Sequence, residues 1–574
     1  MYHATCLSVC LSSYTSVCLS LSLPSCLCDH QTTCLSISAY LSVCLSDCVT
    51  SGLISLVCLQ NAGVDLSSIV TLPLAELSKR IRDGSLQPDA VLHAYMEKAL
   101  EANRKLNCST AVLTESLKQL EDIESHKDGL LYGIPISIKD NLDYEGYDST
   151  CGVLTKLDDP AVKDSVLVSV LKKQGAIPFI KTNIPQGLLN YECSNPIYGR
   201  TVNPCNVEKT CGGSSGGEGA LIAGGGSILG LGSDLGGSVR IPAAFCGICG
   251  LKPTNNRISL HGLSSCVKGG KTALSSVGPM AHDVESLALC MRALLCPDMF
   301  TLDPTVPPIP FNQQVYESSE PLRIGYYESD GYFRPSPSMS RALLETKELL
   351  EKAGHTVSSS LKSSFVFHQR FRNLLTWRTL CVFSEEGPVD PCMQHQAIHW
   401  GFPKFVKKMF SLLLRPVVSL DGSLTAMIGS DLIRDQLWPF ICDDDYIRET
   451  IAEWRKLELD VLLCPMLGPA YNFNYTGKLF TALSCTALYN VLNFPAGVVT
   501  VTEVTAEDED QLKHYRGYFG DAGDKTFVEA IRGGVGLPIA VQCVALPWQE
   551  EMCLRLMREV EKLCAENKCS NTNH

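Results

Sequence analysis

Two clusters of serine and glycine, residues 212–217 and 233–238, lie close together in the chain. Serine hydroxyls act as nucleophiles when a nearby base accepts their proton. Glycine lets other atoms approach the backbone closely, so clustered N–H groups can converge on one point and stabilise an oxyanion. A flexible Gly/Ser linker would be rich in the same residues, but the apolar runs 220–223 and 245–249 lie in this stretch. We therefore expect residues 211–254 to form a catalytic segment.

A lysine at the end of an apolar strand is the candidate general base. Ile134, Ile136 and Ile138 alternate with other residues, which predicts a strand that ends near Lys139. Lysine accepts a proton only in its neutral form, and burial among apolar strands lowers the pKa of a lysine from its ordinary value of about 10.4. Taken alone, Lys139 and Asp140 could also be a solvated surface pair.

The first cluster also permits another assignment of the nucleophile. The Gly-x-Ser-x-Gly pattern around Ser214 is typical of the nucleophile elbow of α/β-hydrolases. That elbow needs a buried strand directly before the serine, whereas residues 206–210 are polar. It also needs a histidine later in the chain, and His261 and His282 are equally well explained as loop or surface residues.

Helices and strands that would position these groups alternate along the chain. Apolar residues at helix spacing predict helices, and short apolar runs between turn residues predict strands. Such alternation is typical of an α/β sheet covered by helices. We expect helices at 74–84, 85–106, 165–173, 336–354, 443–456 and 548–563, and strands at 133–140, 176–181, 321–327, 459–465 and 536–542.

Residues 211–254 resemble the signature segment of the amidase-signature family of serine hydrolases, and the similarity extends over nearly all of the chain after about Gly63. The flanking sequence is most similar to members that hydrolyse fatty acid amides. The resemblance implies one large α/β domain on a large, mixed, twisted β-sheet with helices on both faces. It also implies a Ser-Ser-Lys triad in which Lys139 is the base, Ser214 relays the proton and Ser238 is the nucleophile that carries the acyl group.

The same resemblance assigns supporting residues around the triad. It implies that the peptide bond between Gly213 and Ser214 is cis. Turn hydrogen bonds and a buried ion pair are expected from Ser215, Asp234 and Arg240. An oxyanion hole is expected from the backbone N–H groups of Leu235, Gly236, Gly237 and Ser238.

The composition is that of a large globular protein. Of the 574 residues, 45% are hydrophobic and 19% are charged, which suffices for a large core. The net charge of −13 argues against a general nucleic-acid binder, which usually carries a basic excess. Many of the 28 cysteines are scattered singly through apolar segments, which favours buried free thiols and a reducing, cytosol-facing compartment. The chemistry expected here needs no metal and no other cofactor.

Residues 1–60 form a leader rich in Leu, Ser and Cys with a four-residue repeat. A secretory signal needs a basic start and a compact apolar core, but the first Lys or Arg of the chain is Lys79. We interpret the leader as disordered or as an artefact of gene prediction, because a repeated four-base DNA sequence encodes such a pattern. Residues 61–574 would then be the single catalytic domain, with a divergent loop or a further sequence error at 356–395.

Residues 400–416 combine an apolar face rich in Phe and Leu with a purely basic polar face. This pattern is typical of a helix that lies in a membrane interface, and an amphipathic helix packed on the core is the alternative. The resemblance places a membrane-binding helical cap at 400–428. Lipid-amide members usually also carry a transmembrane helix before the catalytic domain, and no apolar run of about 18 residues precedes it here. We expect this anchor to be absent from the protein or lost from the sequence.

The apolar residues around Leu188 match the position where the family lines its acyl channel, although ordinary core is an equal explanation. Asn190 is expected on the solvent side. Together these observations predict hydrolysis of long-chain fatty acid amides, such as N-acylethanolamines and primary fatty acid amides, to fatty acid and amine. The resemblance implies a homodimer bound to the cytosolic face of an endomembrane such as the endoplasmic reticulum. Two alternatives are an amidase of the same fold that acts on small soluble amides and a catalytically inactive lipid-binding homologue.

Overall fold

The computed structural model describes four segments of the chain: residues 66–266, 274–359, 388–394 and 444–572. The expected leader at 1–60 and the expected membrane helix at 400–416 lie outside the described residues. So does most of the stretch at 356–395, of which only the two ends are described.

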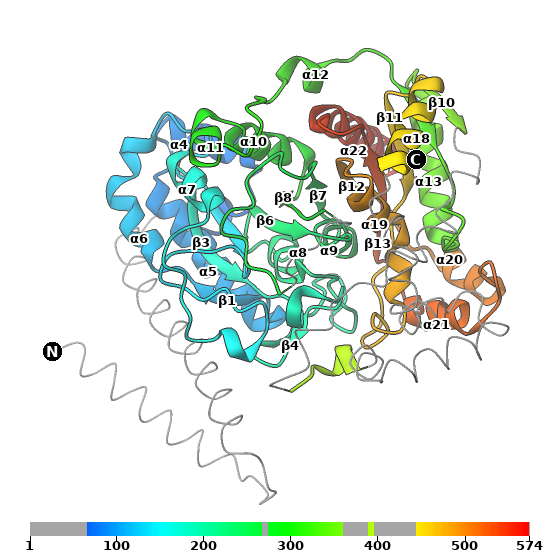
Figure 1. Ribbon diagram of the computed structural model, residues 1–574, viewed down its shortest axis with the longest axis horizontal. Coiled ribbons are helices and arrows are strands. Elements are labelled where there is room, and N and C mark those ends of the chain that lie inside the picture. The colour runs from blue at the N-terminus through cyan, green and yellow to red at the C-terminus, as the bar shows by residue number, and fades with distance from the viewer. Residues whose placement is uncertain (1–65, 267–273, 360–387, 395–443, 573–574) are drawn as a thin grey trace, which may run out of the picture.

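An eleven-stranded mixed β-sheet runs through the molecule (Figure 1). The strand β2 pairs in parallel with both of its neighbours, β3 and β6, whereas β8 is antiparallel to β6 and to β7. In spatial order the strands are β1 (Ser109–Val112), β3 (Ile177–Thr182), β2 (Pro135–Lys139), β6 (Leu229–Asp234), β8 (Ser276–Ala281), β7 (Cys249–Lys252), β12 (Ala496–Glu503), β13 (Pro538–Val544), β11 (Val461–Pro465), β9 (Arg323–Tyr326) and β10 (Thr356–Ser359).

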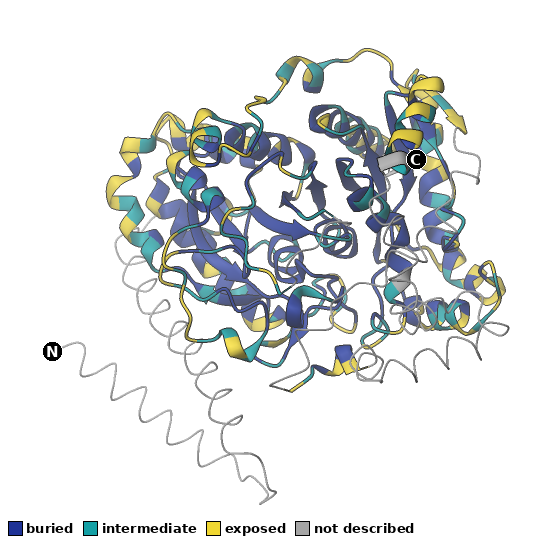
Figure 2. Cartoon of the chain, viewed as in Figure 1, coloured by how far each residue is buried: buried dark blue, intermediate teal, exposed yellow. Residues whose placement is uncertain are grey.

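Helices cover the sheet, and the strands at its centre are buried along their whole length (Figure 2). In β2 and β6 the isoleucines and leucines alternate with small residues, serine in β2 and glycine in β6, and both kinds of residue are buried. The α-helices are α3 (Leu66–Ile69), α4 (Leu74–Arg82), α5 (Pro88–Leu106), α6 (Glu115–Gln119), α7 (Val166–Lys173), α8 (Gly216–Ala223), α9 (Arg240–Cys246), α10 (Val284–Leu294), α11 (Pro297–Leu302), α12 (Gln313–Glu317), α13 (Pro337–Lys352), α18 (Asp444–Lys456), α19 (Ser484–Val491), α20 (Ala506–Gln511), α21 (Ala522–Ile531) and α22 (Glu550–Thr572).

The α/β architecture expected from the sequence is confirmed, and most predicted elements lie within a few residues of their expected bounds. The helix predicted at 336–354 is α13, and Ser336 caps it: its hydroxyl accepts a hydrogen bond from the Met339 N–H, and Pro337 is the first helical residue. The helix expected from residue 85 begins at Pro88 instead. Gln87 precedes α5, and the Ser85 hydroxyl instead donates to the carbonyl of Arg80.

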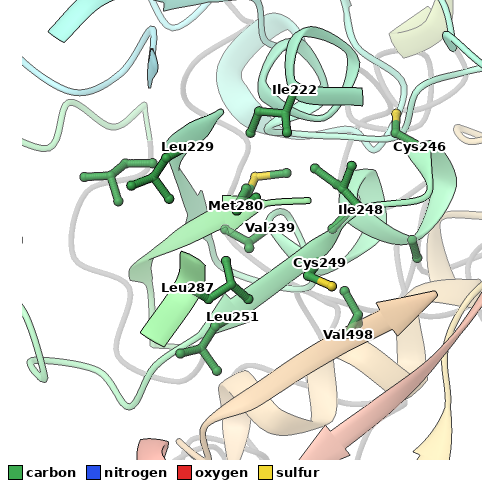
Figure 3. Packing of buried hydrophobic residues seen from close by; sticks show 14 of the residues in the cluster. Ile222, Leu229, Val239, Cys246, Ile248, Cys249, Leu251, Met280, Leu287 and Val498 are labelled. Atoms are coloured by element: carbon green, nitrogen blue, oxygen red, sulfur yellow. The ribbon is translucent and has the colours of Figure 1, made fainter. Parts of the chain in front are cut away.

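The core beside the catalytic segment is tightly packed. In Figure 3, Met280 from β8 extends toward Ile222 from α8, whereas Leu251 from β7 lies beside Leu287 from α10, and all four side chains are fully buried. A Cβ atom added at Gly217 in α8 would lie 2.2 Å from the backbone nitrogen of Asn183. The small residues of the signature stretch therefore allow α8 to lie directly against the neighbouring backbone.

The described segments contain free cysteines and no helix suited to crossing a membrane. All 17 cysteines in the described segments are free thiols, and most of them are buried, as the scattered pattern indicated. Within the same segments, no helix has the length and the apolar character that crossing a membrane requires.

The packing of α13 on β11 and β13 can be tested with two neighbouring leucines. Leu343 is fully buried, whereas Leu344 is 38% exposed. Loss of a buried leucine side chain costs about 2–5 kcal/mol of stability. We expect Leu343→Ala to lower the free energy of unfolding by an amount in this range in denaturant titrations. Leu344→Ala should lower it by less than about 1 kcal/mol, and equal effects would contradict the orientation of α13.

Candidate active site

The candidate groups meet at one edge of the sheet, where two parallel strands end. Lys139 is the last residue of β2, and Asp234 is the last residue of β6. Because β2 and β6 are parallel neighbours, their carboxyl ends lie at the same edge, which is where open α/β sheets place their ligands. The turn after β6 leads into α9, and the first serine-glycine cluster leads into α8.

Lys139 is fully buried at this edge. Its Nζ lies 2.7 Å from Ser214 Oγ, 3.0 Å from Ser233 Oγ and 3.2 Å from the carbonyl oxygen of Ser233. Burial disfavours the charged ammonium and lowers the pKa of Lys139 to about 7, although the negative charge of Asp234 opposes this shift. The amine can therefore hold or release a proton near neutral pH.

The neighbours of Lys139 determine which way its lone pair faces. A neutral amine has two N–H donors and one lone pair. The carbonyl of Ser233 can only accept. The Ser233 hydroxyl lies 3.4 Å from Oδ1 of Asn141, which is also only an acceptor, while the Asn141 Nδ2 donates to the carbonyl of Ser264. The Ser233 hydroxyl therefore donates to Asn141 and accepts from Lys139, which leaves the lone pair of Nζ for the proton of Ser214.

Ser214 is 2% exposed, and the peptide bond that enters it from Gly213 is cis, as the resemblance implied. No strand leads into this serine among the described residues, and α8 begins at Gly216. The nucleophile-elbow alternative therefore lacks the strand that it requires. The N–H of Ser215 donates to the carbonyl of Ser238 at 3.0 Å, so the backbone of the two serine clusters is joined directly beside Ser214.

Ser238 is partly exposed, unlike Ser214 and Lys139. It lies in the turn after β6, where Gly237 has a φ of +128° that side chains rarely adopt. The Gly237 N–H donates to Asp234 Oδ1 at 2.8 Å. The N–H groups of Leu235, Gly236 and Ser238 have no hydrogen-bond partner within the described segments. The turn thus leaves three of the four expected oxyanion donors available and holds the fourth by a carboxylate.

A buried ion pair holds this turn, as expected. Arg240 Nη2 lies 3.0 Å from Asp234 Oδ1, and both side chains are fully buried. Burial alone would raise the pKa of Asp234, but the charge and hydrogen bonds of Arg240 hold this pKa well below its usual range. Asp234 is therefore ionised and can accept hydrogen bonds from the Gly237 and Val239 N–H groups.

The segment around Leu188 passes beside Gly213, the residue before Ser214. A Cβ atom added at Gly213 would lie 3.0 Å from the carbonyl oxygen of Asn190, and Leu188 itself is half-buried. The expectation that Asn190 faces solvent was wrong. It is 4% exposed, and its side-chain amide donates to the carbonyl of Cys392, because it anchors residues 388–394 to this segment.

Two residues that received no individual role from the sequence contact this site, Ser233 and Asn141. Both lie next to residues that were identified, Asp234 and Asp140, so only the three-dimensional contacts reveal their roles. Within the described segments, no three His, Cys, Asp or Glu side chains gather as a metal-binding group.

The lowered pKa of Lys139 predicts a pH-dependent stability. In the unfolded chain this lysine titrates near 10.5, whereas in the folded protein it titrates near 7. Between these values the unfolded state binds one more proton, so folding stability rises with pH. We expect the free energy of unfolding of the wild type to rise relative to Lys139→Met, at up to about 1.4 kcal/mol per pH unit. Denaturant titrations at several pH values measure this difference between the wild type and the variant. For the variant Lys79→Met, in which an exposed lysine is replaced, the difference from the wild type should not change with pH.

Comparisons with known proteins agree with this geometry. The family model described as Amidase matches residues 90–554. The chain is 51% identical to fatty-acid amide hydrolase 1 of Sus scrofa over 89% of this chain and 89% of that protein. It is 37% identical to fatty acid amide hydrolase 1 of Caenorhabditis elegans over 86% and 88% of the two chains.

A more distant relative and a solved structure extend the comparison. An acetamidase of Aspergillus oryzae is 30% identical over 85% of this chain and 89% of its own length. A solved structure titled fatty acid amide hydrolase shares the fold with a TM-score of 0.68 and 24% identity, and the match covers 95% of this chain and 91% of that one. By its sequence and by its fold, the chain belongs to the amidase family.

Proposed function

We propose that this protein is a serine amidase that hydrolyses long-chain fatty acid amides, such as N-acylethanolamines and primary fatty acid amides, to fatty acid and amine. The observation that carries the proposal is the contact of the fully buried Lys139 with Ser214, directly beside the turn that carries Ser238. A nucleophile, a relay and a base with a pKa near neutrality are what hydrolysis of an unactivated amide needs.

Acylation begins when the Ser238 oxygen attacks the carbonyl carbon of the amide. The Ser238 proton passes to Ser214 as the Ser214 proton passes to the neutral Nζ of Lys139. The carbonyl oxygen becomes an oxyanion, which the free N–H groups of Leu235, Gly236 and Ser238 are placed to stabilise. Each donor of this kind contributes on the order of 100- to 1,000-fold to the rate. The Gly237 N–H fixes the turn through Asp234.

Collapse of the tetrahedral intermediate reverses the proton relay. The C–N bond breaks as Ser214 gives its proton to the departing nitrogen, and Lys139 returns its proton to Ser214. An acyl ester on Ser238 and a free amine result. Water then attacks the ester carbonyl with the same base, and the fatty acid leaves. Proton delivery to the nitrogen is what lets the site cleave amides as well as esters.

The proposed substrate class rests on similarity and on sequence. The two relatives with the higher identities reported above are both named as fatty acid amide hydrolases. Leu188 is partly exposed in the segment beside Gly213, which suits contact with an acyl chain. The acetamidase relative keeps a small soluble amide as the alternative substrate. The contact between Lys139 and Ser214 argues against an inactive lipid-binding homologue.

The proposal extends to the membrane and to assembly. We place 61–574 in one catalytic domain, with residues 400–428 as a membrane-binding cap whose helix 400–416 has no acidic residue. A monotopic homodimer on the cytosolic face of an endomembrane would take a lipid amide directly from the bilayer. The free thiols of the described segments are consistent with a reducing compartment.

Active-site labelling tests the assignment of the triad. We expect a fluorophosphonate to label Ser238 in the folded protein, as read by mass spectrometry of the tagged peptide. The labelling rate should rise with pH through about 7, the pKa of Lys139, because only the neutral amine accepts the proton. Lys139→Ala should lose labelling at neutral pH and regain part of it at high pH.

A label on Ser214 would contradict this assignment and restore the nucleophile-elbow alternative. No label on folded protein would favour the inactive homologue. Comparing hydrolysis of a long-chain fatty acid amide with hydrolysis of acetamide then separates the two remaining substrate classes.

Vesicle binding tests the proposed membrane cap. We expect the triple variant Lys404→Glu, Lys407→Glu and Lys408→Glu to bind vesicles with anionic lipid at least about 10-fold more weakly, because each lysine near such a surface contributes about 1 kcal/mol. Co-sedimentation with the vesicles measures the binding.

The matched control changes the same charge elsewhere. Lys79, Lys105 and Lys163 are exposed in other parts of the chain, and their exchange for Glu should leave vesicle binding unchanged. Equal losses in the two triple variants would indicate that net charge, and not the segment 400–416, governs binding.

A further inference from the structure

We infer that Thr486 is a positioning residue for the oxyanion hole, although it lies 250 positions beyond the turn that it holds. The inference rests on the proposed amidase function. Thr486 is fully buried in α19, which packs against the turn after β6. Its Oγ1 donates to the carbonyl oxygen of Gly236 at 2.7 Å.

This hydrogen bond holds one end of a single peptide unit. The carbonyl of Gly236 and the N–H of Gly237 belong to the same planar group and point in opposite directions. Thr486 holds the carbonyl, and Asp234 Oδ1 accepts from the N–H at 2.8 Å. Because both ends are held, the unit cannot rotate. This fixed peptide unit sets the orientation of the neighbouring N–H groups of Gly236 and Ser238. Neither N–H group has a hydrogen-bond partner in the described segments.

The turn lies in direct contact with the threonine. A Cβ atom added at Gly237 would lie 2.5 Å from Thr486 Oγ1, so the contact depends on glycine at that position. A Cβ atom added at Gly236 would lie 3.7 Å from Leu483 and 3.9 Å from Ala487, which are ordinary van der Waals distances. The hydroxyl thus contacts the turn at the peptide unit that separates the proposed oxyanion donors.

The hydroxyl proton of Thr486 has two possible acceptors. Oγ1 also lies 2.9 Å from the carbonyl of Leu483, the local hydrogen bond that threonine commonly makes to a carbonyl three or four residues before it. The single hydroxyl proton is shared between the carbonyl oxygens of Gly236 and Leu483. The longer-range bond to Gly236 is the shorter of the two, and it is the one that orders the turn.

The main chain of α19 is held independently of this hydroxyl. Arg240 Nη1 donates to the carbonyl of Thr486 at 2.8 Å, and Arg240 Nη2 donates to Asn490 Oδ1 at 2.7 Å. Asn490 Nδ2 in turn donates to Asp234 Oδ1 at 3.0 Å. Thr486→Val therefore removes the hydrogen bond to Gly236 while these anchors of the helix stay in place.

The test compares Thr486→Val with Thr486→Ser and with a matched control. Thr346 is also a buried threonine, and its hydroxyl donates only within α13. We expect Thr486→Val to lower kcat about 10- to 100-fold with KM changed less than about 3-fold, because a misplaced oxyanion donor acts on the transition state. The rate of fluorophosphonate labelling should fall by a similar factor. Thr486→Ser and Thr346→Val should stay within about 2-fold of the wild type.

The pH profile separates this role from damage to the base. In Thr486→Val the midpoint of the rate against pH should stay near 7, because the surroundings of Lys139 are untouched. Wild-type kcat in folded Thr486→Val would overturn the inference, as would an equal loss in Thr486→Ser, which would indicate packing alone. If Thr486→Val does not fold, Thr486→Ala gives the same comparison. A folded wild type that neither labels nor hydrolyses amides would instead refute the proposed function and this role with it.

Discussion

The burial of one amine is the constraint on which the site depends. Lys139 lies where water does not reach it, and an isolated charge in such a place costs several kcal/mol. The carboxylate of Asp234 would draw the proton back to the amine, because its charge raises the pKa of Lys139. Arg240 offsets that charge by pairing with Asp234. The ion pair therefore affects the pKa of Lys139 as well as the shape of the turn.

Arg240 also joins distant parts of the chain. A guanidinium has five N–H donors in a fixed plane, and here all are engaged. Two reach Asp234 at the end of β6. The other three reach the carbonyl of Thr486, the side chain of Asn490 and the side chain of Gln542. Removing one partner of a buried ion pair costs about 3–5 kcal/mol, so Arg240 ties the turn after β6 firmly to α19.

The sequence predicted more of the local structure than of the site. Alternating isoleucines located β2, and a serine followed by proline located the start of α13, because both signals are local. The resemblance implied the cis peptide bond between Gly213 and Ser214, which the structure contains, and it is the source of the proposed triad. Asn190 was placed wrongly because its partner, Cys392, lies 202 positions away. Ser233 and Thr486 were missed for the same reason, since neither residue type nor spacing reveals a long-range hydrogen bond.

The long reach of Arg240 has a consequence for how the protein is made. Its partners in α19 and β13 lie 246, 250 and 302 positions after it, so the ribosome produces both serine clusters and the lysine well before them. A growing chain that ends short of β13 contains Lys139, Ser214 and Ser238 but leaves part of the Arg240 guanidinium without its partners. The contacts that hold the turn after β6 to α19 and β13 therefore form late in synthesis, and shortened products of the gene that lack the last third would leave this turn without them despite an intact signature segment.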